Sequence, residues 1–246
     1  MKKNRKKWFR IFKCFLRLFN KRPEFVFLEE KPEQGSIILS NHVGTTAPLK
    51  YELYFDHQFR FWGAHEMNDG MKSMYKYLST TFYQEKKHWK PFPAKLIGFL
   101  GTPITTVIYK GIRLISTYRD TRLRKTLKES IETLNNNESI IIFPEDSSTG
   151  YHDELVGFHP GFVLLLNQYC KDGKDVPIYV SYYQKKQNRY VLGKKYMYSD
   201  FVKQNMTKEE IAEFLKNECN KLGKWKSEEE LAEELPQEKT DKVVIK

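Results

Sequence analysis

The sequence is poor in cysteine and has no long apolar run. Its 246 residues include three widely spaced cysteines, Cys14, Cys170 and Cys219, which excludes a disulfide framework and a cysteine-based metal site and favours a reducing compartment. The longest uncharged apolar stretch, residues 96–109, has 14 residues with two glycines and a proline, whereas a transmembrane helix needs about 20 apolar residues. We therefore predict no membrane span, and expect this stretch to be either a buried element or a shallow membrane-dipping one.

Acidic residues are absent from the first 22 positions. This segment holds ten of the 42 lysines and arginines, and the remaining 32 bases nearly balance the 31 acids. Nucleic-acid-binding proteins usually carry positive charge on the working face of the fold, whereas here the excess lies in the leader. We therefore predict no nucleic-acid partner. A chain of this length, with 40% hydrophobic residues, fits one folded domain.

The basic leader has the pattern of an amphipathic helix. Its large apolar residues recur at steps of three and four, namely Trp8, Ile11, Phe12, Phe15, Leu16 and Phe19. Arg10, Lys13 and Arg17 fall largely on the opposite face, which is typical of a helix lying in the bilayer interface. Anionic headgroups attract each nearby base by about 1 kcal/mol. We predict that residues 1–22 bind an anionic membrane surface through Trp8, Phe12, Phe15 and Phe19. The alternative is a helix docked on the protein's own core.

The rest of the chain predicts an α/β domain with a mainly parallel or mixed sheet flanked by helices. Apolar, β-rich runs predict strands at Ser36–Leu39, Phe59–Gly63, Ile112–Ser116, Ser139–Phe143 and Pro177–Tyr183. Helical spacing predicts helices at Thr121–Leu134, at Phe162–Tyr169, and from a capping box at Thr207 to about Leu222. We expect the domain to span residues 23–223 and a charged tail to span 224–246.

Polar residues follow two of the most apolar predicted strands. Ile37-Ile38-Leu39 runs into Asn41-His42, and Ile140-Ile141-Ile142-Phe143 runs into Pro144-Glu145-Asp146-Ser147. Sites in α/β folds lie beyond the carboxyl ends of parallel strands, so we expect these two loops to form one site.

These segments resemble the glycerolipid acyltransferase family, the proteins similar to lysophosphatidic acid acyltransferase. The resemblance covers roughly residues 35–183 and keeps the family's order of motifs. Its elements are Asn41-His42, Arg119 after a strand, Phe143-Pro144-Glu145, the downstream Phe158 and Gly161, and Val176-Pro177.

The resemblance implies that a fatty acyl group moves from acyl-CoA or acyl carrier protein to the hydroxyl of a lysophospholipid or related lipid. It implies His42 as general base with Glu145 as a second catalytic residue, and no metal or cofactor. The residues implied to bind substrate are Asn41, Arg119, Phe143, Pro144, Asp146, Ser147 and Gly161. Together with the leader, it implies a cytoplasmic location on the inner face of the membrane.

The sequence departs from the family pattern at two places. The position five after His42 is Ala47 instead of aspartate, and the residues after Glu145 are Asp-Ser-Ser instead of Gly-Thr-Arg. The first change removes the carboxylate expected to orient the histidine. A backbone carbonyl or one of several side chains could replace it, namely Thr45, Thr46, Asp56, Glu66 or Asp146. The alternative function is a non-catalytic lipid-binding or scaffold protein on the same fold.

Overall fold

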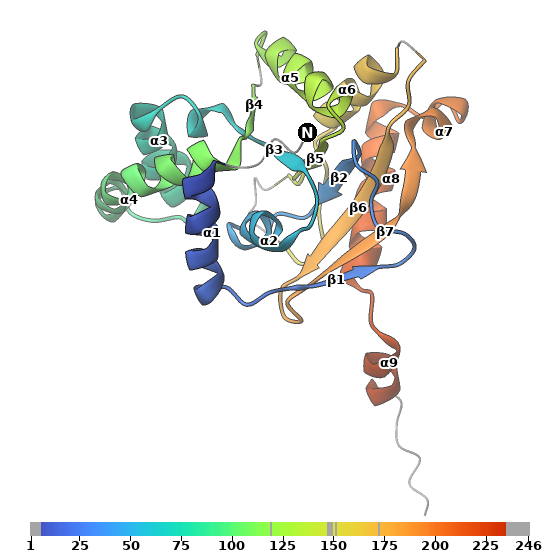
Figure 1. Cartoon of the computed structure of the whole chain (residues 1–246), viewed down its shortest axis with the longest axis horizontal. Helices are drawn as coiled ribbons and strands as arrows, with labels where there is room; N and C mark the ends of the chain where they lie inside the picture. The colour runs from blue at the N-terminus through green and yellow to red at the C-terminus, as the bar shows by residue number, and fades with distance from the viewer. Residues whose placement is uncertain (1–5, 119, 147–149, 151, 172, 235–246) are drawn as a thin grey trace, which may run out of the picture.

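The sheet is the frame on which every candidate residue is placed. The computed structural model describes residues 6–118, 120–146, 150, 152–171 and 173–234. These form a seven-stranded mixed sheet, mostly parallel, in the order β1-β7-β6-β2-β5-β3-β4 (Figure 1). The strands are β1 (Glu24–Phe27), β2 (Ile37–Ser40), β3 (Phe59–Ala64), β4 (Ile115–Thr117), β5 (Ser139–Ile142), β6 (Pro177–Gln184) and β7 (Arg189–Met197). The predicted α/β class is confirmed.

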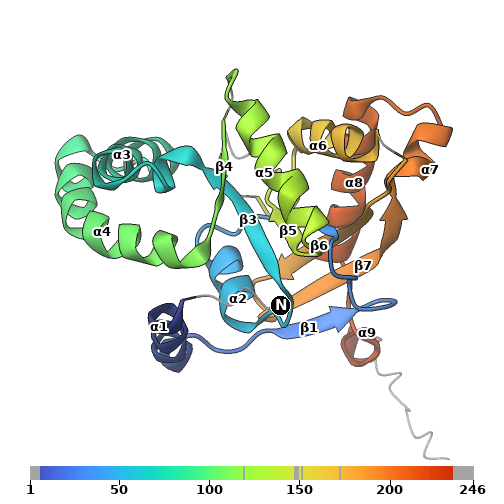
Figure 2. The same cartoon turned by 45° about the horizontal axis from the view of Figure 1, so that its top comes forward.

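Helices cover both faces of this sheet. Figure 2 shows α5 (Leu123–Asn135), α6 (Gly161–Cys170) and α8 (Lys208–Gly223) above the strands, and α1 (Lys7–Phe19) and α2 (Thr46–Tyr54) below them. Two short helices, α7 (Tyr198–Lys203) and α9 (Glu228–Glu234), flank α8 along the chain.

The two central strands are buried on both faces because their side chains are apolar on both. Ile37 and Ile140 belong to the core beneath α5, α6 and α8, whereas Ile38 and Ile141 belong to the core around Tyr51 of α2. A parallel strand covered by helices on both sides needs such a continuous apolar run. The run therefore fixes β2 and β5 at the centre of the domain.

Most of the predicted elements are present with shifted ends. The predicted strands at 36–39, 59–63, 139–143 and 177–183 correspond to β2, β3, β5 and β6, and the three predicted helices to α5, α6 and α8. The capping box is also confirmed, since the Thr207 and Glu210 backbone N–H groups each donate to the other's side chain. The predicted strand at 112–116 begins too early, because a helix continues to Ile112 and ends at Arg113 in the left-handed conformation.

A group of helices inserted between β3 and β4 extends beyond that edge of the sheet. We call it the helical arm: α3 (Met71–Lys76), the π-helical segment η2 (Tyr77–Lys86) and α4 (Pro91–Ile112), preceded by a single 3₁₀ turn, η1 (His65–Met67). Residues 96–109 lie inside α4, where most of the large apolar side chains are exposed. The expectation of a buried element is therefore wrong for this stretch. Among the described helices, none has the length and apolar character required to cross a membrane.

The first helix contacts the domain in an unexpected orientation. Lys13 of α1 forms an ion pair with Glu52 of α2 at 3.0 Å, and Arg17 donates to the Leu53 carbonyl. Among the described residues of α1, Phe9 is the one whose side chain is buried. Helix α1 therefore does not dock on the domain's core through its apolar face. Part of its basic side faces the domain, and most of its apolar side faces outward.

Candidate active site

The two motif loops meet because their strands are neighbours in register. Leu39 of β2 pairs with Ile142 of β5, and the strands are parallel. His42 and Glu145 each lie three residues beyond this pair, at the same edge of the sheet. The expectation that the two loops adjoin is met by a direct hydrogen bond: the backbone N–H of His42 donates to Oε2 of Glu145 at 2.8 Å.

An aromatic wall holds the imidazole of His42. This ring and that of Phe143 form a T-shaped pair, with ring centroids 5.0 Å apart and an interplanar angle of 74°. Phe143 in turn stacks on Phe61 of β3 and meets Tyr51 of α2 edge-on. Such contacts restrict the ring's orientation. The predicted substrate-binding residue Phe143 is thus a support for His42.

Burial controls the protonation of the histidine. Desolvation is the largest cause and the charge of Lys86 the second, and together they lower the pKa of His42 from 6.5 to about 4. The imidazole is therefore neutral at neutral pH. This is the form that accepts a proton.

Burial acts in the opposite sense on Glu145, whose exposed fraction is 8%. Loss of water raises the pKa of this carboxyl from 4.5 to about 7, while the His42 N–H and the Lys86 charge act against the rise. Burial thus reverses the ordinary order of the two pKa values, so that the carboxyl has the higher one. Strongly shifted pKa values are characteristic of functional sites. Of the two groups, Glu145 is the one whose pKa lies near neutral pH, whereas His42 is neutral there.

The loop that carries Glu145 is fastened to the segment before α6. Glu145 forms a single antiparallel bridge with Phe158, the Asp146 N–H donates to the Gly157 carbonyl at 2.9 Å, and the His159 N–H donates to the Pro144 carbonyl at 2.8 Å. Pro144 is buried in this pairing. These contacts fix the position of Glu145 without involving its side chain.

Lys86 is a functional candidate that the sequence analysis missed. It ends η2 in the helical arm, and its charge lowers the pKa of both His42 and Glu145. No local motif marks it, since it is one of two adjacent lysines in a long helical insertion. Its position near the site depends on how the arm folds back.

Asn41 has a structural position instead of the predicted substrate contact. Its Oδ1 accepts from the Tyr183 N–H at 2.7 Å, and its Nδ2 donates to the Tyr183 carbonyl at 3.2 Å. The residue is 2% exposed. It therefore replaces the sheet pairing between β2 and β6 just beyond the last residue of β2, and holds the backbone that leads into His42.

Three further positions named from the sequence have their own contacts in the structure. Gly161 is the first residue of α6, and Oδ1 of Asp146 lies 3.8 Å from Nε2 of His159. Ala47 is fully buried in α2, and its carbonyl accepts from the Tyr190 hydroxyl at 2.5 Å. Of the carboxylates considered as partners for the His42 ring, Glu66 instead lies 3.6 Å from His65.

Arg119 and Ser147 lie outside the described residues. Next to Arg119, Tyr118 stacks on His65 with centroids 4.8 Å apart, and the Arg122 guanidinium lies over the same ring. Nδ1 of His65 lies 2.7 Å from the Asp69 carboxylate. This second polar cluster follows β3 and β4, at the same edge of the sheet as His42.

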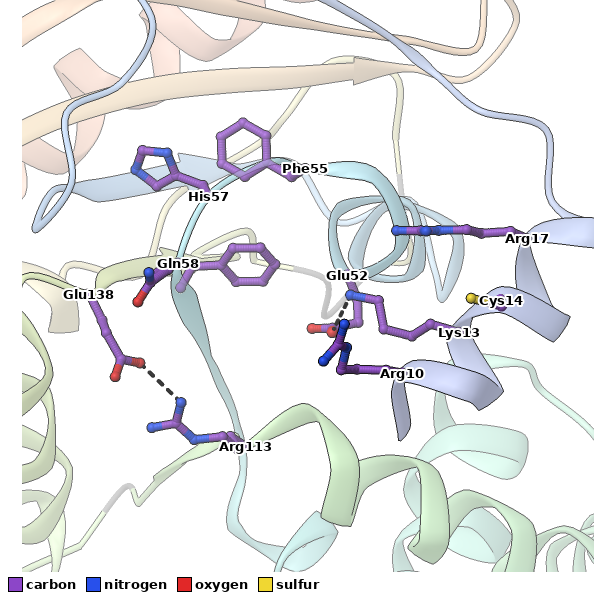
Figure 3. Close-up of a pocket in the computed structure, with 11 residues that line it drawn as sticks. Arg10, Lys13, Cys14, Arg17, Glu52, Phe55, His57, Gln58, Arg113 and Glu138 are labelled. Atoms are coloured by element: carbon purple, nitrogen blue, oxygen red, sulfur yellow. Dashed lines mark hydrogen bonds and ion pairs between the residues drawn. The ribbon is translucent and has the colours of Figure 1, made fainter. Parts of the chain in front are cut away.

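A separate cavity of about 320 Å³ lies at the opposite, amino-terminal edge of the strands. Figure 3 shows it between α1 and the residues that precede β3, β4 and β5. Lys13 pairs there with Glu52, and Arg113 pairs with Glu138 at 3.2 Å. The two ion pairs offset half of the charge of the four lysine and arginine side chains that line it, and His42 is not among the lining residues.

The described residues contain no group of three or more His, Cys, Asp or Glu placed to hold a metal ion. Comparison with known protein families and with curated proteins finds no match for this chain.

Proposed function

We propose that this chain is an acyltransferase that works at a membrane surface. It moves a fatty acyl group from acyl-CoA or acyl carrier protein to the hydroxyl of a lysophospholipid or related lipid. The observation that supports this most is the hydrogen bond between His42 and Glu145, because each residue belongs to a separate motif of the resemblance.

In the proposed reaction, His42 accepts the proton of the acceptor hydroxyl while that oxygen attacks the thioester carbonyl. Nδ1 of His42 is shielded from solvent, so Nε2 is the nitrogen that meets the substrate. The tetrahedral oxyanion then collapses, the C–S bond breaks, and the departing thiolate takes the proton from His42. The products are an ester and a free thiol, and no covalent enzyme intermediate forms.

Glu145 and Lys86 assist this step in different ways. The Glu145 carboxylate holds the backbone of His42 and so positions the base. Lys86 supplies a positive charge beside both groups, and we assign it to the anionic headgroup of the acceptor. In this assignment Lys86 supplies part of the positive charge that is missing because the loop reads Asp-Ser-Ser instead of Gly-Thr-Arg.

Helix α1 provides membrane contact in this proposal. Trp8, Phe15 and Phe19 are exposed, whereas Phe12 is half-buried. An outward-facing aromatic row on a segment rich in bases fits the interface of an anionic bilayer. The location would be the cytoplasmic face of the membrane.

The buried Ala47 favours a second candidate, a lipid-binding protein on this fold without turnover. The discriminating experiment incubates the full chain with labelled acyl-CoA or acyl carrier protein and a panel of lyso-lipids in vesicles. Formation of acylated lipid with equimolar free thiol supports the enzyme. Saturable lipid binding without thiol release, for every donor and acceptor, contradicts it and supports the binding protein.

A further inference from the structure

Helix α4 exposes large apolar side chains along one continuous stripe. Phe92, Phe99 and Ile104 are 80%, 68% and 65% exposed. The stripe also includes four other exposed residues at steps of three and four, namely Leu96, Leu100, Pro103 and Val107. A patch of this kind on a folded domain marks an interaction surface.

The opposite face of α4 is built from small residues. Ala94, Gly98, Thr102 and Thr106 are buried, and a Cβ added at Gly98 would lie 3.1 Å from the Cβ of Ser79 in η2. A helix on a water-exposed surface normally buries its large apolar residues and exposes polar ones. The arrangement in α4 is the reverse, and close packing through small residues is typical of helices whose outer surroundings are lipid.

The charge around the stripe has one sign. From Lys86 through Arg119, both included, the sequence has seven lysines and arginines and no acidic residue. An anionic surface complements this charge. A second copy of the chain would bring the same positive charge to the contact and be repelled, so the charge favours a lipid surface.

Helix α1 contacts α4 through one buried side chain. The Phe9 ring packs so closely on Gly111 that a Cβ at that position would lie 2.0 Å from it. Both views show α1 beside the C-terminal part of α4 (Figures 1 and 2). Helix α1 is therefore packed against α4 at Gly111, just beyond the C-terminal end of the stripe.

We infer that the outer stripe of α4 inserts into the headgroup and acyl boundary of an anionic bilayer, with its axis in the membrane plane. Lys90, Lys95 and Lys110 would contact lipid phosphates. This contact is separate from the one proposed for α1 and does not depend on acyl transfer. The candidate active site lies near the N-terminal end of α4. Lys86, whose charge lowers the pKa of His42, comes only a few residues before α4 begins.

The test is binding of the full chain to vesicles of phosphatidylglycerol and phosphatidylcholine, measured by co-sedimentation over a range of lipid concentrations. The variant Phe99→Glu/Leu100→Glu changes two exposed positions of the stripe. The matched control, Val202→Glu/Leu231→Glu, adds the same charges at exposed apolar positions of α7 and α9. Circular dichroism and thermal unfolding verify that both variants fold.

We expect the stripe variant to bind vesicles at least roughly tenfold more weakly than the control, because two large apolar groups leave the interface. Phe99→Ser/Leu100→Ser should lose most of the same affinity, which separates insertion from charge repulsion and provides a milder variant if the glutamates impair folding. His42→Ala should bind like the wild type, so failure of the catalytic proposal leaves this result unchanged.

Two outcomes would overturn the inference. The first is stripe variants that bind vesicles as tightly as the control. The second is a change of oligomeric state: the wild type is a dimer in sedimentation velocity, the stripe variants are monomers, and vesicle binding is unchanged. That result would assign the stripe to contact with a second copy of the chain.

Discussion

The Glu145 carboxylate accepts a hydrogen bond from the backbone N–H of His42, with the two heavy atoms 2.8 Å apart. The bond joins residues 103 positions apart in the chain, and it orients the base through its backbone instead of its ring. A chain without an aspartate at position 47 thus still has a carboxylate that controls where the histidine lies.

Replacing Glu145 with glutamine should change how stability depends on pH. The folded-state pKa of Glu145 is raised from 4.5 to about 7, so its contribution to stability is full below about pH 4.5 and is lost as the pH rises through about 7. Glutamine does not titrate and still offers an oxygen to the His42 N–H. Relative to the wild type, the free energy of unfolding of Glu145→Gln should therefore rise by about 2 kcal/mol between pH 5 and 8.

The effect of His42 on stability has the opposite sign, since its pKa is lowered to about 4, but it is common to both proteins and cancels in the difference. Urea unfolding across this pH range provides the measurement. Parallel stability curves for the two proteins would contradict a raised carboxyl pKa.

Lys86→Ala should raise the pKa of His42. The lysine charge is the second cause of the lowered value, after burial, so the pKa in the variant should move upward from about 4 while staying below 6.5. NMR titration of the imidazole resonances measures this directly. Lys87→Ala removes the adjacent exposed ammonium, which lies over the Phe82 ring, and serves as control. Equal shifts in both variants would argue against a specific position for Lys86.

Asn41→Ala should destabilise the domain by about 2–4 kcal/mol. The substitution leaves the Tyr183 backbone N–H and carbonyl without the amide that pairs with both, and each unsatisfied buried group costs about 1–3 kcal/mol. Asn217→Ala, on the exposed surface of α8, should stay within about 0.5 kcal/mol of the wild type. An Asn41 variant as stable as this control would mean that Asn41 does not hold β2 to β6.

Ala47→Asp should impair the protein, although it restores the residue of the family pattern. Ala47 is fully buried against Tyr190, and a carboxylate there would lose its water without a matched partner. We expect a loss of about 2 kcal/mol or more in the free energy of unfolding and no gain in turnover. Thr45→Asp places the same charge at the exposed N-cap of α2 and should be neutral or slightly stabilising. A stable Ala47→Asp protein with raised turnover would show that the missing aspartate limits catalysis.

The central sheet was predictable from sequence for a simple physical reason. The runs at Ile37–Leu39 and Ile140–Phe143 are apolar at every position, and only a strand covered on both faces needs that pattern. The strand-end position of His42 and Glu145 follows from the same reasoning. Their hydrogen bond does not, because it depends on the register between β2 and β5.

Other features depend on contacts that periodicity does not describe. Gly98, Gly101 and Pro103 read as helix breakers in isolation, yet they lie within the continuous helix α4, where Gly98 allows the close approach to η2. The spacing of apolar residues in α1 defines its two faces without saying which one meets the protein. The position of Lys86 likewise arises from the packing of the helical arm.

The most direct test of the account is the turnover of His42→Ala with labelled acyl donor and the lyso-lipid that the wild type acylates best. A general base contributes about 10²–10⁴ in rate, so turnover should fall by that factor while vesicle binding and thermal unfolding stay close to the wild type. His152→Ala, an exposed histidine of the same region, should keep its activity. An active wild type whose His42→Ala variant releases thiol and forms ester at the normal rate would contradict the proposed mechanism.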